Sequence, residues 1–145
     1  FQMVDKELEQ QFFEKKLWGD RVQSLILVPQ IMISHPITLQ SLRQAAALLQ
    51  ADALVVIRPL TYSLGKASLF SDNMAKSTTA IEVLVLDTRT NVVPYTSLIT
   101  EDAEITETSN DYSQMDLLGR AMRVSEKKAM LQVPAAIDKF MSGVL

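Results

Sequence analysis

The stretch IEVLVLDTRTNVVPYTS, residues 81–97, decides the fold because it joins two β-rich runs through a short polar segment. Apolar residues take alternate positions before the polar segment, beginning at Ile81, and again after it, which is the spacing of half-buried strands. Asp87 can accept a hydrogen bond from a backbone amide two residues further on, and Asn91 tolerates the left-handed conformation of a tight turn. The sequence therefore predicts a hairpin that turns at 87–91. A binding site built from the carboxylate, hydroxyls and guanidinium of DTRT is the less favoured interpretation.

The chain upstream of this hairpin has the pattern strand, helix, strand. Thr38 is a suitable N-cap for a helix over 38–50, and the alanines of that helix would let it approach a sheet closely. The run ADALVVIRP that follows is typical of a strand buried on both faces. The run VQSLILVPQIMI, residues 22–33, predicts a strand that ends or bulges at Pro29. Together these elements predict a right-handed βαβ unit with parallel strands.

Helices are expected at both ends of the chain. Apolar residues at helical spacing predict a helix over 3–18 and a long helix over 112–141, which Pro134 should kink or break. The element order is then α-β-α-β-β-β-α. We expect one α/β (α+β) domain over residues 1–145, with a four-stranded mixed sheet that the helices cover on one face or flank closely. The last helix should carry its apolar stripe and its methionines into the core: Met115, Leu118, Met122, Met130 and Met141.

Composition limits the possible functions. Of the 145 residues, 48% are hydrophobic and 21% are charged, as in many globular proteins, and the formal net charge is −3. The chain therefore lacks the basic field that nucleic acid requires. No apolar run reaches the roughly 20 residues of a membrane helix, and the absence of cysteine excludes disulfides and thiolate chemistry. Because the chain begins at Phe1 without a signal peptide, we expect that a targeting segment has been removed.

Few residues suggest chemistry. The segment EDAEITE gathers four carboxylates: Glu101, Asp102, Glu104 and Glu107. A solvent-facing strand end explains most of these charges, and a hard-cation site is less favoured because the spacing and glycine of an EF-hand loop are absent. His35, the one histidine, is expected in a loop rather than as a general base. Lys66 lacks the flanking residues of a phosphate loop.

Residues 63–77, SLGKASLFSDNMAKS, predict the longest loop because they are mostly small and polar. Three larger apolar side chains interrupt this polar character: Leu69, Phe70 and Met74. They either fold back on the core or bind a partner, because loops often carry function and exposed apolar groups mark contact surfaces. We expect this loop to meet a partner protein or a second copy of the chain.

Two stretches, LRQAAALLQADALVVIRP and IEVLVLDTRTNVVPYTS, resemble the α/β domain of bacterial envelope lipoproteins. That group includes the curli-secretion channel protein and the lipoprotein activator of penicillin-binding proteins. In the family a helix ends near an Ala-Asp pair, here Ala51-Asp52, and a later strand ends in Asp-x-x-Thr-Gly, here Asp87, Thr90 and Asn91. Asparagine in place of the family's glycine is a mild departure, because both residues tolerate positive φ. A rhombotarget-like lipoprotein is a narrower hypothesis, although the terminal MSGVL shows no sorting tail.

The resemblance implies a non-enzymatic lipoprotein domain of the cell envelope or outer membrane that binds another envelope protein or itself. It implies a periplasm-facing location, a lipid anchor outside this chain, and no catalytic residue or cofactor. The alternative is a small cytoplasmic enzyme or ligand-binding protein that uses carboxylates, with Glu101, Asp102 and Glu104 as the candidates.

Overall fold

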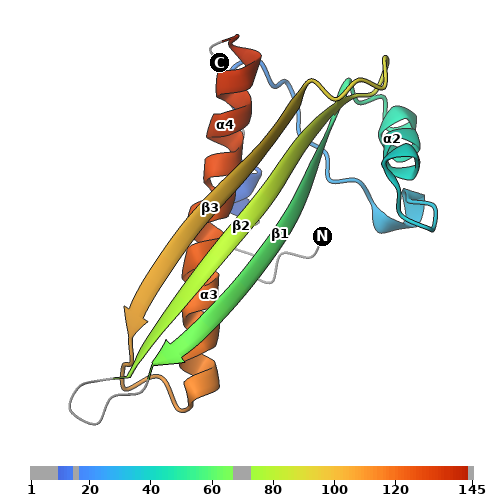
Figure 1. Ribbon diagram of the computed structural model, residues 1–145. Helices are drawn as coiled ribbons and strands as arrows, with labels where there is room; N and C mark the ends of the chain where they lie inside the picture. Colours follow the sequence, from blue (N-terminus) through green and yellow to red (C-terminus); the bar gives the residue numbers. More distant parts are fainter. Residues whose placement is uncertain (1–9, 15–16, 67–72, 144–145) are drawn as a thin grey trace.

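The computed structural model describes residues 10–14, 17–66 and 73–143. Two helices cover one face of an antiparallel sheet, and a third helix lies beside the start of the first strand (Figure 1). The strands run in the order β1 (Ala53–Lys66), β2 (Met74–Asp87) and β3 (Tyr95–Thr106). The helices are α2 (Leu39–Leu48), α3 (Gln114–Met130) and α4 (Gln132–Met141), and a short 3-10 helix, η2, spans Gln30–Met32. Within the described ranges, no helix combines the length and the apolar character needed to cross a bilayer.

The β2–β3 hairpin confirms the turn predicted at 87–91. Asp87 Oδ1 accepts a hydrogen bond from the Arg89 amide at 2.9 Å, and Asn91 adopts a φ of 61°. The Asn91 amide donates to the Asp87 carbonyl at 2.9 Å and closes the turn. The carboxylate and the asparagine therefore serve turn geometry, as the more favoured interpretation held.

The predicted four-stranded mixed sheet and its βαβ unit are wrong. The described residues before β1 contain no strand, and 22–29 form no regular element. Val22, Leu25 and Val28 pack inward at every third position, whereas a strand would bury every second residue. Apolar composition alone suggested a strand here, but the burial pattern does not alternate. The sheet is consequently three-stranded and antiparallel, and the fold is α+β.

The loop predicted over 63–77 is also too long. β1 and β2 pair along their full lengths, and Ser63 lies opposite Ser77 in the ladder. The strands leave only a short connection between Lys66 and Met74. Small polar residues suggested a loop, yet Ser77 is fully buried beneath α3 because its hydroxyl finds hydrogen-bond partners there.

The helical segment predicted over 112–141 is confirmed, and it breaks as predicted. α3 ends at Met130 and α4 begins at Gln132, so the break at Leu131 comes three residues before Pro134. Proline has no amide hydrogen for the carbonyl four residues earlier, and its ring would collide with that carbonyl in a continuous helix. The predicted helix over 38–50 is confirmed as α2, with a reciprocal capping box between Thr38 and Ser41.

The predicted helix over 3–18 survives only in part within the described residues. Gln10–Phe12 are helical, but Phe13 and Glu14 leave the helix. Trp18 folds back over this turn, and its indole nitrogen donates to the Phe12 carbonyl at 2.8 Å. The rings of Phe12 and Trp18 also meet edge to face at 5.3 Å. This closed aromatic turn replaces the continuous helix.

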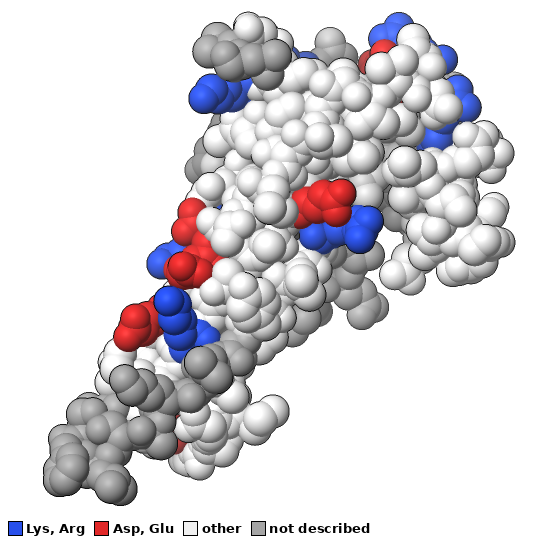
Figure 2. Space-filling view, viewed as in Figure 1, with Lys and Arg blue, Asp and Glu red and all other residues white. Residues whose placement is uncertain are grey.

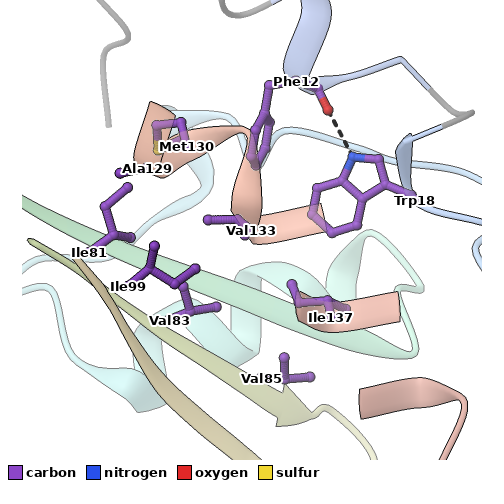
Figure 3. Close-up of a cluster of buried hydrophobic side chains, with 10 residues drawn as sticks. All are labelled: Phe12, Trp18, Ile81, Val83, Val85, Ile99, Ala129, Met130, Val133 and Ile137. Carbon is purple, nitrogen blue, oxygen red and sulfur yellow. Dashed lines mark hydrogen bonds between the residues drawn. The ribbon is translucent and has the colours of Figure 1, made fainter. Parts of the chain in front are cut away.

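The main core lies between the sheet and the α3–α4 pair (Figure 3). Phe12 and Trp18 close it on one side, and two residues enter from each helix: Ala129 and Met130 from α3, Val133 and Ile137 from α4. The sheet supplies the remaining four: Ile81, Val83, Val85 and Ile99. A smaller cluster on the other face of the sheet joins Ala46 of α2 to Leu54 and Leu86. The three helices therefore do not all cover the same face.

α3 faces the sheet with a different stripe from the one expected. Leu117, Ala121, Ser125 and Ala129 are buried, whereas Leu118 and Met122 are only half-buried. Of the four methionines expected in the core, Met130 alone is buried, and Met115 and Met141 are exposed. Small residues on the true stripe allow the helix to approach the strands closely.

Candidate interaction surface

One half of the outer sheet face carries exposed apolar side chains. Alternation along the strands places Leu60, Tyr62 and Leu98 on the face opposite α3, and each is more than 60% exposed. Arg58 and Glu82 form an ion pair at 3.7 Å beside them. This face is largely uncharged, and its acidic and basic groups lie next to one another in a few places (Figure 2).

A second exposed apolar surface lies on the segment before and within the start of α2. No Asp, Glu, Lys or Arg occurs from Val22 to Leu42, and we name residues 22–42 the charge-free segment. Of its residues, only Ser41 is fully buried. Ile31 is 95% exposed, and four more large aliphatic side chains are about half exposed: Ile26, Leu27, Ile37 and Leu39. The lobe at the right-hand side of Figure 2, below the basic groups at the upper right, shows no charged group.

The first part of the same segment makes no backbone hydrogen bonds. Residues 22–28 make no backbone hydrogen bond to any other part of the chain that the structure describes. Val22 and Leu25 pack on the main core, whereas Val28 packs on the smaller cluster across the sheet. The segment thus passes from one side of the sheet to the other without joining its ladder.

Both edges of the sheet carry features that oppose strand pairing. β1 contains Pro59, which has no amide hydrogen to offer a neighbouring strand. β3 places three carboxylates along its length, at Glu101, Asp102 and Glu104. Proline and like charges on an edge both discourage edge-to-edge association. The exposed apolar side chains, rather than the edges, are therefore the stronger candidates for contact.

The structure describes one of the three residues that were predicted to bind a partner. Leu69 and Phe70 lie outside the described residues. Met74 is the first residue of β2, half-buried between Lys66 and Thr106 of the neighbouring strands. The role predicted for these three side chains stays a prediction.

The candidate carboxylates of EDAEITE do not converge. Glu101 points to the helix-covered side and contacts the Gln132 amide of α4. Asp102 points to the outer face and accepts a hydrogen bond from Thr78 at 2.6 Å, and Glu104 shares that outer face. Among the described residues, no group of three potential ligands is placed to hold a metal ion. His35 lies exposed in the turn before α2, as expected, and Lys66 ends a strand rather than a phosphate loop.

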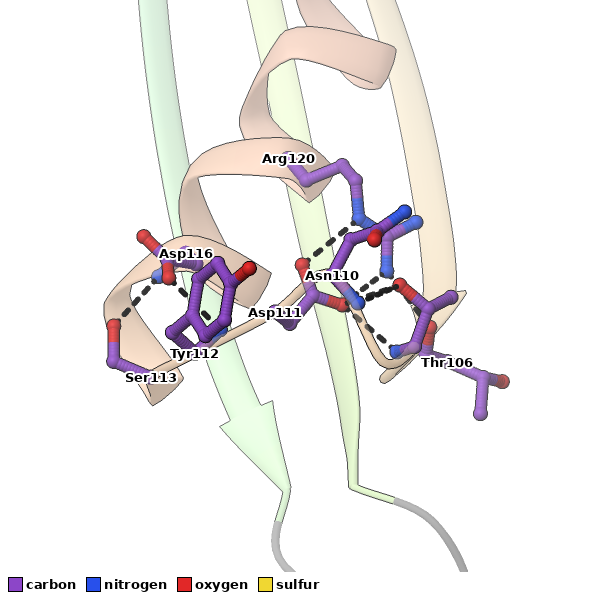
Figure 4. A network of polar contacts seen from close by, with 8 residues as sticks. Thr106, Asn110, Asp111, Tyr112, Ser113, Asp116 and Arg120 are labelled. Carbon is purple, nitrogen blue, oxygen red and sulfur yellow. Dashed lines mark hydrogen bonds and ion pairs between the residues drawn. The ribbon is translucent and has the colours of Figure 1, made fainter.

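A polar network fixes the corner between β3 and α3 (Figure 4). Arg120 clamps Asp111 with two hydrogen bonds, of 2.6 Å and 3.2 Å, and also donates to the Thr106 carbonyl at 2.8 Å. The hydrogen bond from Arg120 is the main cause that lowers the pKa of Asp111 from 3.8 to about 2, and the Thr108 amide adds to it. The Arg120 guanidinium thus makes its hydrogen bonds to groups of the protein itself.

An open pocket of about 390 Å³ lies over this corner, between the exposed side chains of Tyr112 and Met115. Asp116, which also lines it, accepts a hydrogen bond from the Tyr112 amide at 3.0 Å. The polar groups of the pocket mainly cap α3 and hold the loop before it. We assign the corner a structural role.

Four hydroxyls form a buried chain that sequence reasoning missed. Thr61 Oγ1 lies 2.9 Å from Thr79 Oγ1, which lies 2.7 Å from Ser125 Oγ, and Ser125 Oγ lies 2.9 Å from Ser77 Oγ. Ser77 donates to the Tyr62 carbonyl at 3.2 Å. When each hydroxyl donates to the next one in this order, and the last donates to the Tyr62 carbonyl, all four hydroxyls donate one hydrogen bond each. No imidazole or carboxylate joins it in the described residues, so it holds α3 on β2 and has no base to activate a serine.

Comparison with known proteins supports the fold but assigns no function. No protein-family model matches the chain, and no curated protein matches its sequence. The structure is similar to that of the hypothetical protein CT253 from Chlamydia trachomatis, with a TM-score of 0.59 and 14% identity over 98% of this chain and 87% of that chain. A "putative lipoprotein" from Caulobacter crescentus CB15 matches with a TM-score of 0.49 and 8% identity, over 64% and 69% of the two chains. The likeness to CT253 shows a shared fold, and the second match is too weak to carry an argument.

Proposed function

We propose that this chain is a non-enzymatic domain of a bacterial envelope lipoprotein that binds or assembles with another envelope protein. It would face the periplasm and be held at the membrane by a lipid anchor outside residues 1–145. One observation carries the proposal: the charge-free segment exposes five large aliphatic side chains, and Ile31 is 95% exposed. Exposed apolar side chains that gather on one segment mark candidate contact sites on proteins.

Two further observations support a binding role. The cores of protein interfaces are depleted of charged residues, as this segment is. The two sequence stretches that resemble envelope lipoproteins lie on α2, β1 and the β2–β3 hairpin, next to the segment. The alternative of a carboxylate enzyme has less support, because Glu101 lies on the opposite sheet face from Asp102 and Glu104.

Fractionation and co-purification of the natural protein test the proposal. We expect the protein in the membrane fraction, with a co-purifying envelope protein that is lost in Ile31→Asp. Leu98→Asp is the matched control, because Leu98 is 69% exposed but lies on β3, outside the charge-free segment. A signal peptide ending in a lipobox cysteine upstream of Phe1 would agree with the proposal. Recovery in the cytoplasm without any partner would contradict it.

A further inference from the structure

Residues 17–37, which we name the N-terminal arm, are attached to the rest of the described chain by side chains alone. The hydrogen bonds that the arm makes are local, as between the Met32 amide and the Pro29 carbonyl at 3.0 Å. None of them joins the arm to the described residues from 38 onward. Directly after the arm this changes, because Arg43 Nε donates to the Thr88 carbonyl at 3.1 Å and fixes α2 to the hairpin turn.

One side chain anchors the arm. Of all arm residues, Trp18 alone is fully buried, with 2% of its surface exposed. Its ring lies in the same cluster as Val133 and Ile137 of α4 (Figure 3). The other apolar side chains that the arm turns toward the two clusters are only half-buried: Leu17, Val22, Leu25 and Val28.

Two polar features hold the arm beside α4, both close to this anchor. Arg21 and Asp138 form an ion pair of 4.0 Å with both side chains well exposed, and such pairs contribute little to stability. Gly19 adopts a φ of 76°, and its backbone lies so close to α4 that a Cβ added there would collide with the Asp138 carboxylate. The close approach at Gly19 therefore exists only while the arm lies on α4.

This attachment is weak for the length of chain that it orders. Fixing each residue of the arm costs conformational entropy, whereas one buried anchor and four half-buried side chains remove only a limited apolar area from water. Segments with few buried apolar contacts and without hydrogen bonds to their surroundings open at a lower free energy than core strands. β1 and β2, in contrast, are paired along all 14 residues of each strand.

We infer that the N-terminal arm is a detachable strap, which opens as one unit while the sheet and its three helices stay folded. Opening withdraws the Trp18 ring and uncovers Val133 and Ile137 on α4. Ile31 of the charge-free segment lies on the arm, so a partner bound there shifts the opening according to its affinity for the open and the closed arm. The inference does not require that this partner be an envelope protein.

The single tryptophan of the chain makes the opening measurable, because its fluorescence reports on the arm. Far-ultraviolet circular dichroism reports mainly on the rest, since the arm contains no strand and no α-helix. In a urea series of the unmodified chain, Trp18 should become accessible to acrylamide at a lower urea concentration than the one that abolishes the circular dichroism signal. Two separate steps show two separate cooperative units.

Gly19→Ala sharpens this test. Alanine at a positive φ is strained, and its Cβ meets Asp138 only in the closed arm, so the opening constant should rise about tenfold. The Trp18 step should move to lower urea, and the circular dichroism step should stay in place because the open arm relieves the strain. Gly143→Ala is the matched control, since Gly143 has a φ of 74° but a Cβ there meets nothing within 4 Å. It should leave the Trp18 step unchanged.

Three results would overturn the inference. In the first, acrylamide quenching and circular dichroism of the unmodified chain change together at every urea concentration, which would make the arm and the sheet one unit. This comparison needs no variant and therefore decides the inference by itself. In the second, Gly19→Ala moves both steps by the same amount. In the third, Gly143→Ala moves the Trp18 step as far as Gly19→Ala does.

Discussion

The sheet face beneath α3 and the charge-free segment both mix aliphatic and hydroxyl side chains, yet the two regions use them in opposite ways. Under α3, Ile81 and Thr79 are completely buried, and each hydroxyl of the buried chain has a partner. On the charge-free segment, Ile31 is 95% exposed and the backbone of 22–28 has no backbone partner in the described chain. Similar composition therefore stabilises the fold in one region and stays free for contact in the other.

This difference shows why apolar content alone does not locate a core. A side chain contributes to folding only when other elements exclude water from it. α3 and α4 do this for the sheet, whereas no described element covers Ile31. The two regions should consequently respond differently to the same substitution.

The largest contrast is expected for matched isoleucines. Ile81→Ala should lower the free energy of unfolding by about 2–5 kcal/mol, because it removes a buried side chain and leaves a cavity. Ile31→Ala should change it by less than about 0.5 kcal/mol in the monomer, because the side chain is already in water. Urea denaturation at a dilution where the chain is monomeric measures both values. Equal losses would show that Ile31 belongs to the folded core and would break the comparison.

A smaller effect is expected in the hydroxyl chain. Ser125→Ala should cost about 1–3 kcal/mol, because Thr79 and Ser77 then lose a hydrogen-bond partner in a buried place. The double variant Ser125→Ala with Thr79→Val should recover part of that loss by removing one unsatisfied group. Ser24→Ala, in the exposed backbone of the charge-free segment, is the control. If Ser125→Ala and Ser24→Ala unfold at the same denaturant concentration, the buried chain contributes nothing.

Loss of the α2 cap tests how firmly the charge-free segment is joined to the rest. Thr38→Ala should cost about 1 kcal/mol, because the Thr38 hydroxyl accepts the Ser41 amide hydrogen at 3.1 Å. Thr38→Ser keeps the hydroxyl and should stay near the starting stability. Thermal unfolding followed by circular dichroism compares the two. An unchanged melting temperature in Thr38→Ala would mean that α2 unfolds separately from the sheet.

The smallest effect is expected in acid. The pKa of Asp111 is about 2 in the folded chain, against a usual value of 3.8, because Arg120 binds its carboxylate. A lowered pKa stabilises the fold at pH values above 3.8, and this contribution is lost as the pH falls toward 2. Asp111→Asn and Arg120→Gln should each reduce the dependence of stability on pH between 4 and 2. If both variants keep the slope of the unmodified chain, the pair does not act on stability.

Local turn and cap chemistry could be predicted from the sequence because single residues determine it. Asp87 and Asn91 closed the hairpin as expected, and Thr38 capped α2. Pro134 likewise separated α4 from α3. Each of these features depends on neighbours a few residues away, so no tertiary information was needed.

Features that depend on distant contacts could not be predicted in this way. The segment 22–33 has strand-like composition, but within 22–28 every third residue packs inward because this stretch crosses between two clusters. Ser77 suggested a loop, and only the approach of Ser125 from α3 makes it a buried strand residue. The exposure of Ile31 could not be predicted either, because the neighbouring residues in the sequence do not distinguish an exposed aliphatic side chain from a buried one. Two of the three residues of the expected site, Leu69 and Phe70, lie outside the described residues.

The position of the charge-free segment in the chain has a consequence for synthesis. The ribosome releases residues 22–42 before it makes β1–β3, the strands against which Val22, Leu25 and Val28 later pack. Strands β1, β2 and β3 follow one another directly in the sequence and can pair as soon as they leave the ribosome, because sequence-local contacts form fast. The apolar segment is complete before these strands are, and during that interval its apolar side chains are exposed to wrong association or to a chaperone.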